Sequence, residues 1–287
     1  MPELPPVDRV LAATACSTMG AFRCPVEHPL FRDSGPISQC IVVFPRTSVR
    51  IKHEGFAPFL ADPTVVTVYN RAQRYERFPV SPTGDHCDWF GVSDDVARDI
   101  VRAFDPAAAE SERPFQMQWA RSSSSLYVRQ RALQRRAARG ELTALELDEV
   151  VTTIVAEALR DAYRHRALAL TNGTRATARR RELVDAARSE LQRTVRHNVS
   201  VHDIADAIGT TPFHLCRVFR ADTGVTMHRY RDALRMRLVL EALESRPLGQ
   251  TISALALDVG YCSHAHLVRA TRQHFGMTPT ALAVYLG

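Results

Sequence analysis

The sequence lacks the long apolar runs and the cysteine pairs that mark membrane and disulfide-bonded proteins. No segment of the 287 residues approaches the roughly 18 to 20 consecutive apolar residues that cross a bilayer, which excludes an integral membrane protein with helical spans. Glu3, Asp8 and Arg9 precede only a short apolar stretch, so no signal peptide is expected. The six cysteines include no C-x-x-C pair. Reduced thiols and a cytoplasmic location are therefore expected.

The sequence also has almost no lysine, and its positive charge is unevenly distributed. Lys52 is the one lysine among 37 basic residues, and the formal net charge is +6. Residues 1–174 contain 21 basic and 21 acidic residues, whereas residues 175–287 contain 16 arginines and 10 acids. A neutral part followed by a basic part favours one module for a small ligand or partner and one for a polyanion, above all nucleic acid. Ordinary surface charge is the alternative.

Length and composition predict two folded domains. Apolar residues make up 45% of the chain, which is enough for a core and argues against disorder. Single cores stop growing at about 250 residues. The run Thr171-Asn172-Gly173-Thr174 has the small polar composition of a linker. We therefore expect domains at 1–170 and 180–287, joined by a linker at 171–179.

Residues 180–287 have the apolar spacing of helices and contain one short pattern twice. Ser200 and Asp203 form a capping box, and Thr211-Pro212 starts the next helix. Two short helices joined by a turn with glycine are typical of a helix-turn-helix. The pattern recurs after 51 to 52 residues, and residues 227–246 between the copies are predicted to form one long helix. The matched positions are Ile204-Ala205 with Leu255-Ala256, Ile208-Gly209 with Val259-Gly260, Leu215 with Leu267, and Gly224 with Gly276.

These repeats resemble the DNA-binding domain of AraC/XylS-type transcription regulators. The resemblance covers about Arg180 to Gly287 and includes both copies, their order and the long helix between them. It implies two recognition helices, which the rigid helix places into successive major-groove faces on one side of duplex DNA. It also adds RNA polymerase to the candidate partners.

Helix geometry indicates which side chains face the DNA. The predicted buried faces consist of Leu215, Val218 and Phe219 in the first recognition helix, and of Leu267, Ala270 and Phe275 in the second. The DNA-binding candidates are Thr211, Phe213, Cys216, Arg217, Arg220, His264, His266, Arg269 and Arg272. We expect Phe213, Cys216 and Arg217 near base edges and Arg220 on phosphate. The resemblance implies base contacts at the start of the second helix and at Arg269. Exposed arginines that are only solvated are the alternative.

The second copy departs from the family pattern at one position. Thr271 stands where a bulky aromatic residue usually follows the matching arginine by two positions. The second unit is therefore expected to be more loosely held, or to be compensated by Tyr261 or Tyr285. His264 and His266 do not predict a zinc site, because residues two apart on a helix do not face each other.

Residues 37–92 change to period-two patterns with proline and glycine between them. The predicted strands are Ile37 to Phe44, Thr47 to Lys52, Thr64 to Tyr69 and Trp89 to Val92. This pattern predicts an all-β barrel or sandwich, and the resemblance implies a cupin-like ligand-binding and dimerisation domain at this place. The predicted fold class is α+β multidomain, with an N-terminal cupin-like β-barrel with helices and a C-terminal all-α domain with two helix-turn-helix units.

A small barrel lined by polar and aromatic side chains is a natural site for an effector. The candidate effector-binding residues are His53, Tyr69, Tyr75, His86 and Trp89. His53, Glu54, His86 and Cys87 have the chemistry of metal ligands, but the usual cupin H-x-H with a downstream Glu is absent. We therefore predict no metal, no cofactor and no catalytic residue, and we favour buried structural roles for His86 and Cys87.

Two helices are predicted after the β-rich region. Residues 126–139 carry five arginines and no acid, and the arginines are expected to pair with acids on the next helix. That next helix has a continuous apolar stripe from Leu147 to Ala162. Either the barrel or a second copy of the chain must cover this stripe. We favour the second copy, and hence a homodimer.

The sequence as a whole predicts a cytoplasmic, sequence-specific transcription regulator that binds double-stranded DNA and responds to a small effector. One alternative is a constitutive DNA-binding protein whose barrel only dimerises. Another is a bifunctional enzyme with metal chemistry at His53 and His86, although the sequence favours a protein that is not an enzyme. The operator, the effector and the choice between activation and repression are not predicted.

Overall fold

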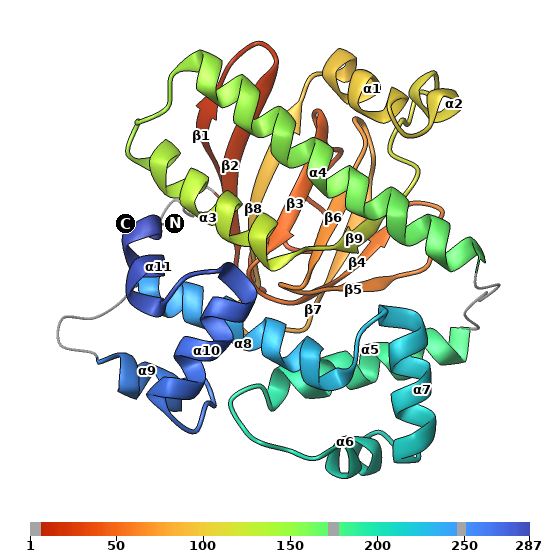
Figure 1. Cartoon of the computed structure of the whole chain (residues 1–287). Helices are drawn as coiled ribbons and strands as arrows, with labels where there is room; N and C mark the ends of the chain where they lie inside the picture. Colours follow the sequence, from red (N-terminus) through yellow and green to blue (C-terminus); the bar gives the residue numbers. More distant parts are fainter. Residues whose placement is uncertain (1–6, 172–177, 246–250) are drawn as a thin grey trace. The chain divides into compact units, whose positions relative to one another are not determined.

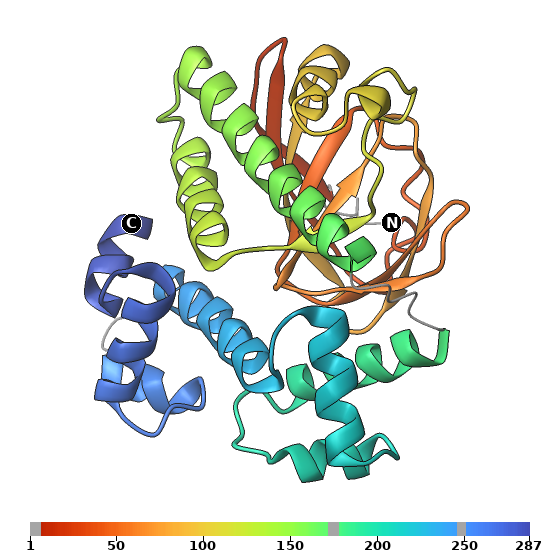
Figure 2. The same ribbon diagram turned by 45° about the vertical axis from the view of Figure 1, so that its right-hand side comes forward.

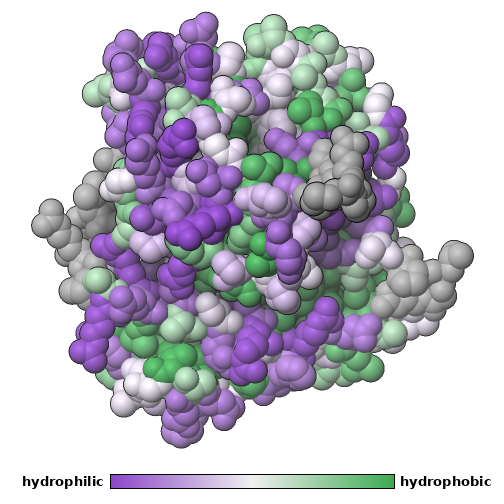
Figure 3. All heavy atoms as spheres, turned by 180° about the vertical axis from the view of Figure 1, so that it is seen from behind, coloured by the Kyte–Doolittle hydropathy of each residue, from purple (hydrophilic) through white to green (hydrophobic). Residues whose placement is uncertain are grey.

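The computed structural model describes residues 7–171, 178–245 and 251–287 and divides into two compact units, Met1–Asn172 and Gly173–Gly287 (Figure 1). The predicted linker at 171–179 falls mostly on residues 172–177, which lie outside the described residues. No described helix is long and apolar enough to span a membrane. On the face shown in Figure 3, hydrophobic residues are interspersed among many hydrophilic ones.

The N-terminal unit is built from two antiparallel sheets. The six strands of the larger sheet lie in the spatial order β1 (Asp8–Ala13), β2 (Ser17–Cys24), β8 (Asp85–Val92), β3 (Cys40–Pro45), β6 (Val65–Tyr69) and β9 (Trp119–Arg121). The smaller sheet has the order β5 (Phe59–Ala61), β4 (Val49–His53) and β7 (Tyr75–Pro79). The predicted β-rich N-terminal part and helical C-terminal part are confirmed. The strand pairing of the described residues gives two separate sheets and not a single closed barrel.

The four predicted strands correspond to β3, β4, β6 and β8, and five further strands were not predicted. Strand β2 is inconspicuous because it contains Gly20, Ala21 and hydroxyl residues instead of an apolar run. Strand β7 was missed because its inward positions alternate Tyr75 with a charged residue, Arg77. The strands with clear apolar patterns, β3, β4, β6 and β8, were therefore predicted from the sequence. Strands with more polar or smaller residues, such as β2 and β7, were recognised only in the structure.

Helices cover one face of the larger sheet. Both α3 (Ser124–Ala138) and α4 (Ala144–Thr171) lie across it in Figures 1 and 2. The buried apolar stripe of α4 runs from Leu147 to Ala162 and packs against β9, β8 and β2. The expectation that a second copy of the chain covers this stripe is therefore wrong, because the chain's own sheet covers it. Two short helices, α1 (Asp94–Arg102) and α2 (Pro106–Ala109), complete the unit.

The arginines of α3 are mostly engaged in ion pairs within the unit. Arg129 lies 2.8 Å from Glu157, and Arg136 lies 3.2 Å from Glu146, so both bind acids of α4 as predicted. Arg131 is buried and bonds to Asp88 of β8 instead. These arginines hold the helices to each other and to the sheet.

The C-terminal unit is entirely helical among its described residues. Its helices are α5 (Ala178–Arg193), α6 (Val201–Ala207), α7 (Pro212–Thr223), α8 (Met227–Glu244), α9 (Ile252–Asp258), α10 (His264–Phe275) and α11 (Pro279–Leu286). The predicted caps are present. The Ser200–Asp203 capping box starts α6, and Thr211 caps α7. Gly224 and Gly276 end α7 and α10 in the left-handed conformation.

Candidate functional site

The first recognition helix, α7, is anchored by one face and exposed on the other. Leu215, Val218 and Phe219 are buried as predicted, and the Phe219 ring packs edge-to-face on Tyr230 of α8. The predicted DNA-facing residues Thr211, Phe213, Cys216, Arg217 and Arg220 are all exposed. Phe213 is 80% exposed, so its ring is accessible to a partner.

The second recognition helix, α10, presents a similar face. His264, Arg269 and Arg272 are exposed, and Leu267 and Ala270 are buried as predicted. Phe275 is only half-buried, so its predicted place in the core is partly wrong.

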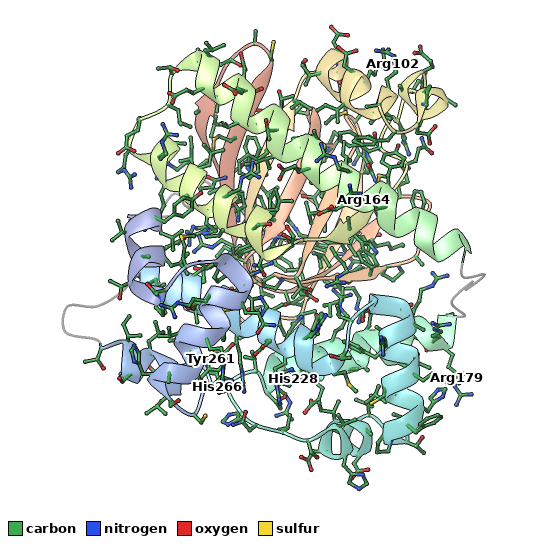
Figure 4. All side chains as sticks on the ribbon, in the orientation of Figure 1. Arg102, Arg164, Arg179, His228, Tyr261 and His266 are labelled. Atoms are coloured by element: carbon green, nitrogen blue, oxygen red, sulfur yellow. The ribbon has the colours of Figure 1, made fainter. Side chains whose placement is uncertain are left out.

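The predicted candidate His266 is half-buried. Its ring packs on Tyr261 at a centroid distance of 4.9 Å, and its Nδ1 lies 3.3 Å from the Cys262 thiol (Figure 4). These contacts leave His266 less free than His264 to reach DNA.

A polar cluster takes the place of the missing aromatic residue in the second unit. Thr271 is fully buried, and its hydroxyl donates to the Val268 carbonyl oxygen. Tyr261 is also buried, and its hydroxyl donates to Asp232 of α8 at 3.1 Å. Compensation by Tyr261 is therefore present, whereas Tyr285 is 46% exposed and provides none.

The same aspartate also faces the end of α10. His274 Nε2 lies 3.8 Å from the second carboxylate oxygen of Asp232. Burial raises the pKa of Asp232, but the nearby His274 ring and the hydrogen bond from Tyr261 outweigh it, and the pKa lies below its usual value of 3.8. One side chain of α8 thus contacts the turn before the second recognition helix, through Tyr261, and the last turn of that helix, through His274.

Arg235 of α8 connects the two helix-turn-helix units. Its Nε donates to the Val195 carbonyl oxygen at 2.8 Å, and its guanidinium lies 5.4 Å from the centre of the Tyr261 ring. Gly260, in the turn of the second unit, has a φ of 89°. A Cβ added there would lie 2.6 Å from the Arg196 carbonyl oxygen. These contacts were not predicted from the sequence, although Asp232 and Arg235 are three residues apart and therefore share one face of α8.

A groove between α5 and α7 adds positive charge beside the first recognition helix. Its lining includes Arg179 of α5 and both His214 and Arg217 of α7. Arg179 is exposed and is labelled in Figure 4. It was not among the predicted DNA-binding residues, because it precedes the repeated pattern.

A cavity of about 160 Å³ lies between the two sheets of the N-terminal unit. Three of the predicted effector-binding residues, Tyr69, Tyr75 and Trp89, line it. Burial raises the pKa of Tyr75 to about 12 and that of Tyr69 above its usual value. Both phenols are therefore neutral hydrogen-bonding groups near pH 7.

Two predicted effector-binding residues do not line the cavity. His86 points to the other side of β8 from its neighbours Asp85 and Cys87, which do line it. His53 is fully buried behind Tyr69, with ring centroids 4.6 Å apart, and burial lowers its pKa to about 4. Neither side chain is among the lining residues: His86 is on the outward face of β8, whereas His53 shares the inward face of β4 with Val49 and Ile51 but does not reach the cavity. Their role in effector binding stays a prediction.

The described residues contain no group of three or more His, Cys, Asp and Glu side chains that could hold a metal ion. His53 and Cys87 instead belong to the apolar interior, and burial raises the pKa of the Cys87 thiol well above its usual value. A protonated thiol of this kind is a poor nucleophile.

The family match lies within the C-terminal unit. Residues 204–283 match the model of a family described as a helix-turn-helix domain. The probable transcription factor PqrA of Proteus vulgaris is 33% identical over 92 residues, which are 32% of this chain and 71% of PqrA. The bifunctional transcriptional activator/DNA repair enzyme Ada of Escherichia coli K12 is 31% identical over 80 residues.

The Ada match covers 28% of this chain and only 22% of Ada, so the chain spans about a fifth of that relative's length. Among solved structures, a transcriptional regulator with an AraC-type DNA-binding domain from Chromobacterium violaceum is similar, with 23% identity and a TM-score of 0.35. That similarity covers 39% of this chain and 97% of the Chromobacterium protein.

Proposed function

This chain belongs to the AraC/XylS type of transcription regulators, and from this premise we propose that it regulates transcription by binding specific sequences in duplex DNA through α7 and α10. The observation that carries the proposal is the pair of exposed recognition faces held by one helix, α8, within a single unit. Arg217 and Arg269 read bases, because guanidinium groups bind guanine edges bidentately. Arg220, Arg272 and Arg179 contact phosphates.

In the proposed complex, Thr211, Phe213 and Cys216 lie near base edges at the first recognition helix, and Phe213 offers an apolar contact to a thymine methyl group. His264 and His266 take the same place at the start of the second. The basic C-terminal part, with 16 arginines against 10 acids, supports attraction to the DNA backbone.

The proposal extends to the N-terminal unit. Its cavity binds a small effector that alters DNA binding, and the protein acts without catalysing a reaction of its own. It acts in the cytoplasm as a homodimer that also contacts RNA polymerase. A cupin-like relationship of the unit belongs to the same proposal.

Selection of bound sequences from a random DNA pool by the full chain tests DNA recognition. Two recognition helices on one face predict a motif of two short blocks about 10 to 10.5 base pairs apart. A dimer predicts that this motif occurs twice. Recovered sequences without any shared motif, bound with an affinity that depends only on salt, would contradict sequence-specific regulation.

A further inference from the structure

Resting on the proposed effector role of the cavity between the sheets, we infer that its ligand is a small uncharged aromatic molecule with a hydroxyl group, the size of phenol, and that the cavity rejects carboxylic acids. Four features of the cavity support this ligand class: its volume, the fixed ring of Trp89, the two neutral phenols of Tyr69 and Tyr75, and the arginine Arg77, whose charge is already paired.

The size and the apolar walls fit one aromatic ring. The cavity measures about 160 Å³, and an apolar protein cavity of about 150 Å³ holds a benzene molecule. Phe22, Ile41, Val43, Ile51 and Trp89 contribute apolar surface from both sheets.

The indole of Trp89 is fixed as part of the wall. Its Nε1 donates to Asp8 Oδ1 at 2.8 Å. Its ring lies directly over Gly20 of the neighbouring strand, where an added Cβ would be 2.4 Å from Trp89 Cζ2. Glycine at position 20 is thus required for this ring position, and the cavity is shaped before a ligand enters.

Two phenols provide the polar end of the site. The Tyr69 and Tyr75 rings are 5.0 Å apart and both line the cavity. The Tyr69 hydroxyl bonds to the Thr67 side chain and the Tyr75 hydroxyl to the Ser34 side chain. Because a phenol hydroxyl both donates and accepts, each can take part in one further hydrogen bond. A single hydroxyl on the ligand matches this pair.

The one cation among the described lining residues is not available to an anion. Arg77 is 2% exposed, and it donates to the Phe31 carbonyl oxygen at 2.7 Å, to Asp85 at 3.0 Å and to the Leu30 carbonyl oxygen at 2.8 Å. Its guanidinium also stacks on Phe22 at 4.4 Å from the ring centre. A carboxylate ligand would meet no free positive charge and would approach Asp8 and Asp85, so it is excluded.

Fluorescence of the full chain tests this ligand class. The chain has two tryptophans, and Trp119→Phe leaves Trp89 of the cavity as the reporter. Phenol, toluene and benzoate are titrated against this variant. We expect saturable changes with phenol and toluene, and binding of benzoate at least tenfold weaker than that of phenol.

Tyr75→Phe should weaken phenol binding several-fold and change toluene binding by less than twofold. Tyr285→Phe, on the C-terminal unit, is the matched control and should change neither. Ala61→Leu fills the cavity from β5 and should abolish both responses. This second variant keeps the test decisive if Tyr75→Phe does not fold.

Benzoate binding as tight as phenol binding, or no saturable response to phenol and toluene from folded protein, would overturn the inference. DNA selection with the same protein preparation, carried out without phenol, toluene or benzoate, distinguishes failure of the ligand class from failure of the proposed function. Selected DNA without a phenol response rejects only the ligand class, whereas the absence of a DNA motif rejects the proposed function.

Discussion

The two helix-turn-helix units have the same arrangement of helices but hold their recognition helices by different forces. In the first unit, the buried rings of Phe219 and Tyr230 pack edge-to-face in an apolar cluster. In the second, Thr271 fills the corresponding place, and Asp232 binds Tyr261 and His274 through polar contacts. A repeated sequence pattern therefore specifies the positions of helices and leaves the type of core open.

The difference predicts where each unit is vulnerable. An apolar core is sensitive to lost volume and insensitive to pH, whereas a hydrogen-bonded carboxylate is sensitive to protonation. The joint through Arg235 and Gly260 makes the second unit depend on the first as well.

The largest expected effect is that of Phe219→Ala in the first unit. Removing this fully buried ring should destabilise the C-terminal unit by about 3 to 5 kcal/mol. Thr271→Ala, the matched change in the second unit, removes only a hydroxyl bonded to the Val268 carbonyl oxygen and should cost about 1 kcal/mol. Urea unfolding followed by circular dichroism measures both. Equal losses would show that the two cores do not differ as described.

The turn glycines should differ next. Gly209 has a φ of 69° and no atom within 4 Å of an added Cβ, so Gly209→Ala should cost about 1 to 2 kcal/mol from backbone strain alone. Gly260→Ala adds a collision with the Arg196 carbonyl oxygen and should cost more. Hydrogen exchange of the amides in α6 and α9 reports each loss locally. A smaller effect at Gly260 would argue against the joint between the units.

Substitutions of the exposed arginines should affect DNA binding in two different ways. Arg217→Ala and Arg269→Ala should each lose about 1 to 3 kcal/mol of affinity and relax specificity at one position. Arg220→Ala should weaken all sequences alike. Arg102→Ala, on the N-terminal unit, removes the same charge from an exposed site and is the control (Figure 4). Binding to sets of single-base operator variants distinguishes these outcomes, and a uniform loss at all three residues would refute the assignment.

The sequence predicted most of the C-terminal unit because its signals are local. Caps such as Ser200–Asp203 and glycines such as Gly224 act within a few residues, and helical periodicity placed Leu215 and Arg217 on opposite faces. The Tyr261–Asp232 bond spans 29 residues and has no local signal. In the N-terminal unit, the unpredicted strands β2 and β7 supply Phe22 and Arg77 of the cavity, so the site could not be assembled from pattern alone.

The smallest expected effect is the acid sensitivity of the second unit. Because the pKa of folded Asp232 lies below 3.8, its contribution to stability is complete above that pH and is lost as the pH falls below it. His228 of α8 also faces this carboxylate and supports its charge. Tyr261→Phe removes one of its hydrogen bonds and should cost about 1 kcal/mol at neutral pH. It should also reduce the acid-dependent loss, because the folded pKa then moves back toward its usual value.

The N-terminal unit provides an internal contrast for this titration. Burial lowers the pKa of His53 from 6.5 to about 4, so this unit should lose stability as the pH falls from 6.5 to about 4 and should not change further through this residue. Both tryptophans lie in that unit, so fluorescence follows it separately from hydrogen exchange at α10. The amides of α10 could instead lose their protection from hydrogen exchange at the same pH as the fluorescence changes, with no effect of Tyr261→Phe. That result would show that Asp232 does not hold the second recognition helix. Loss confined to pH values below 3.8 would make the two units differ in chemistry as well as in sequence.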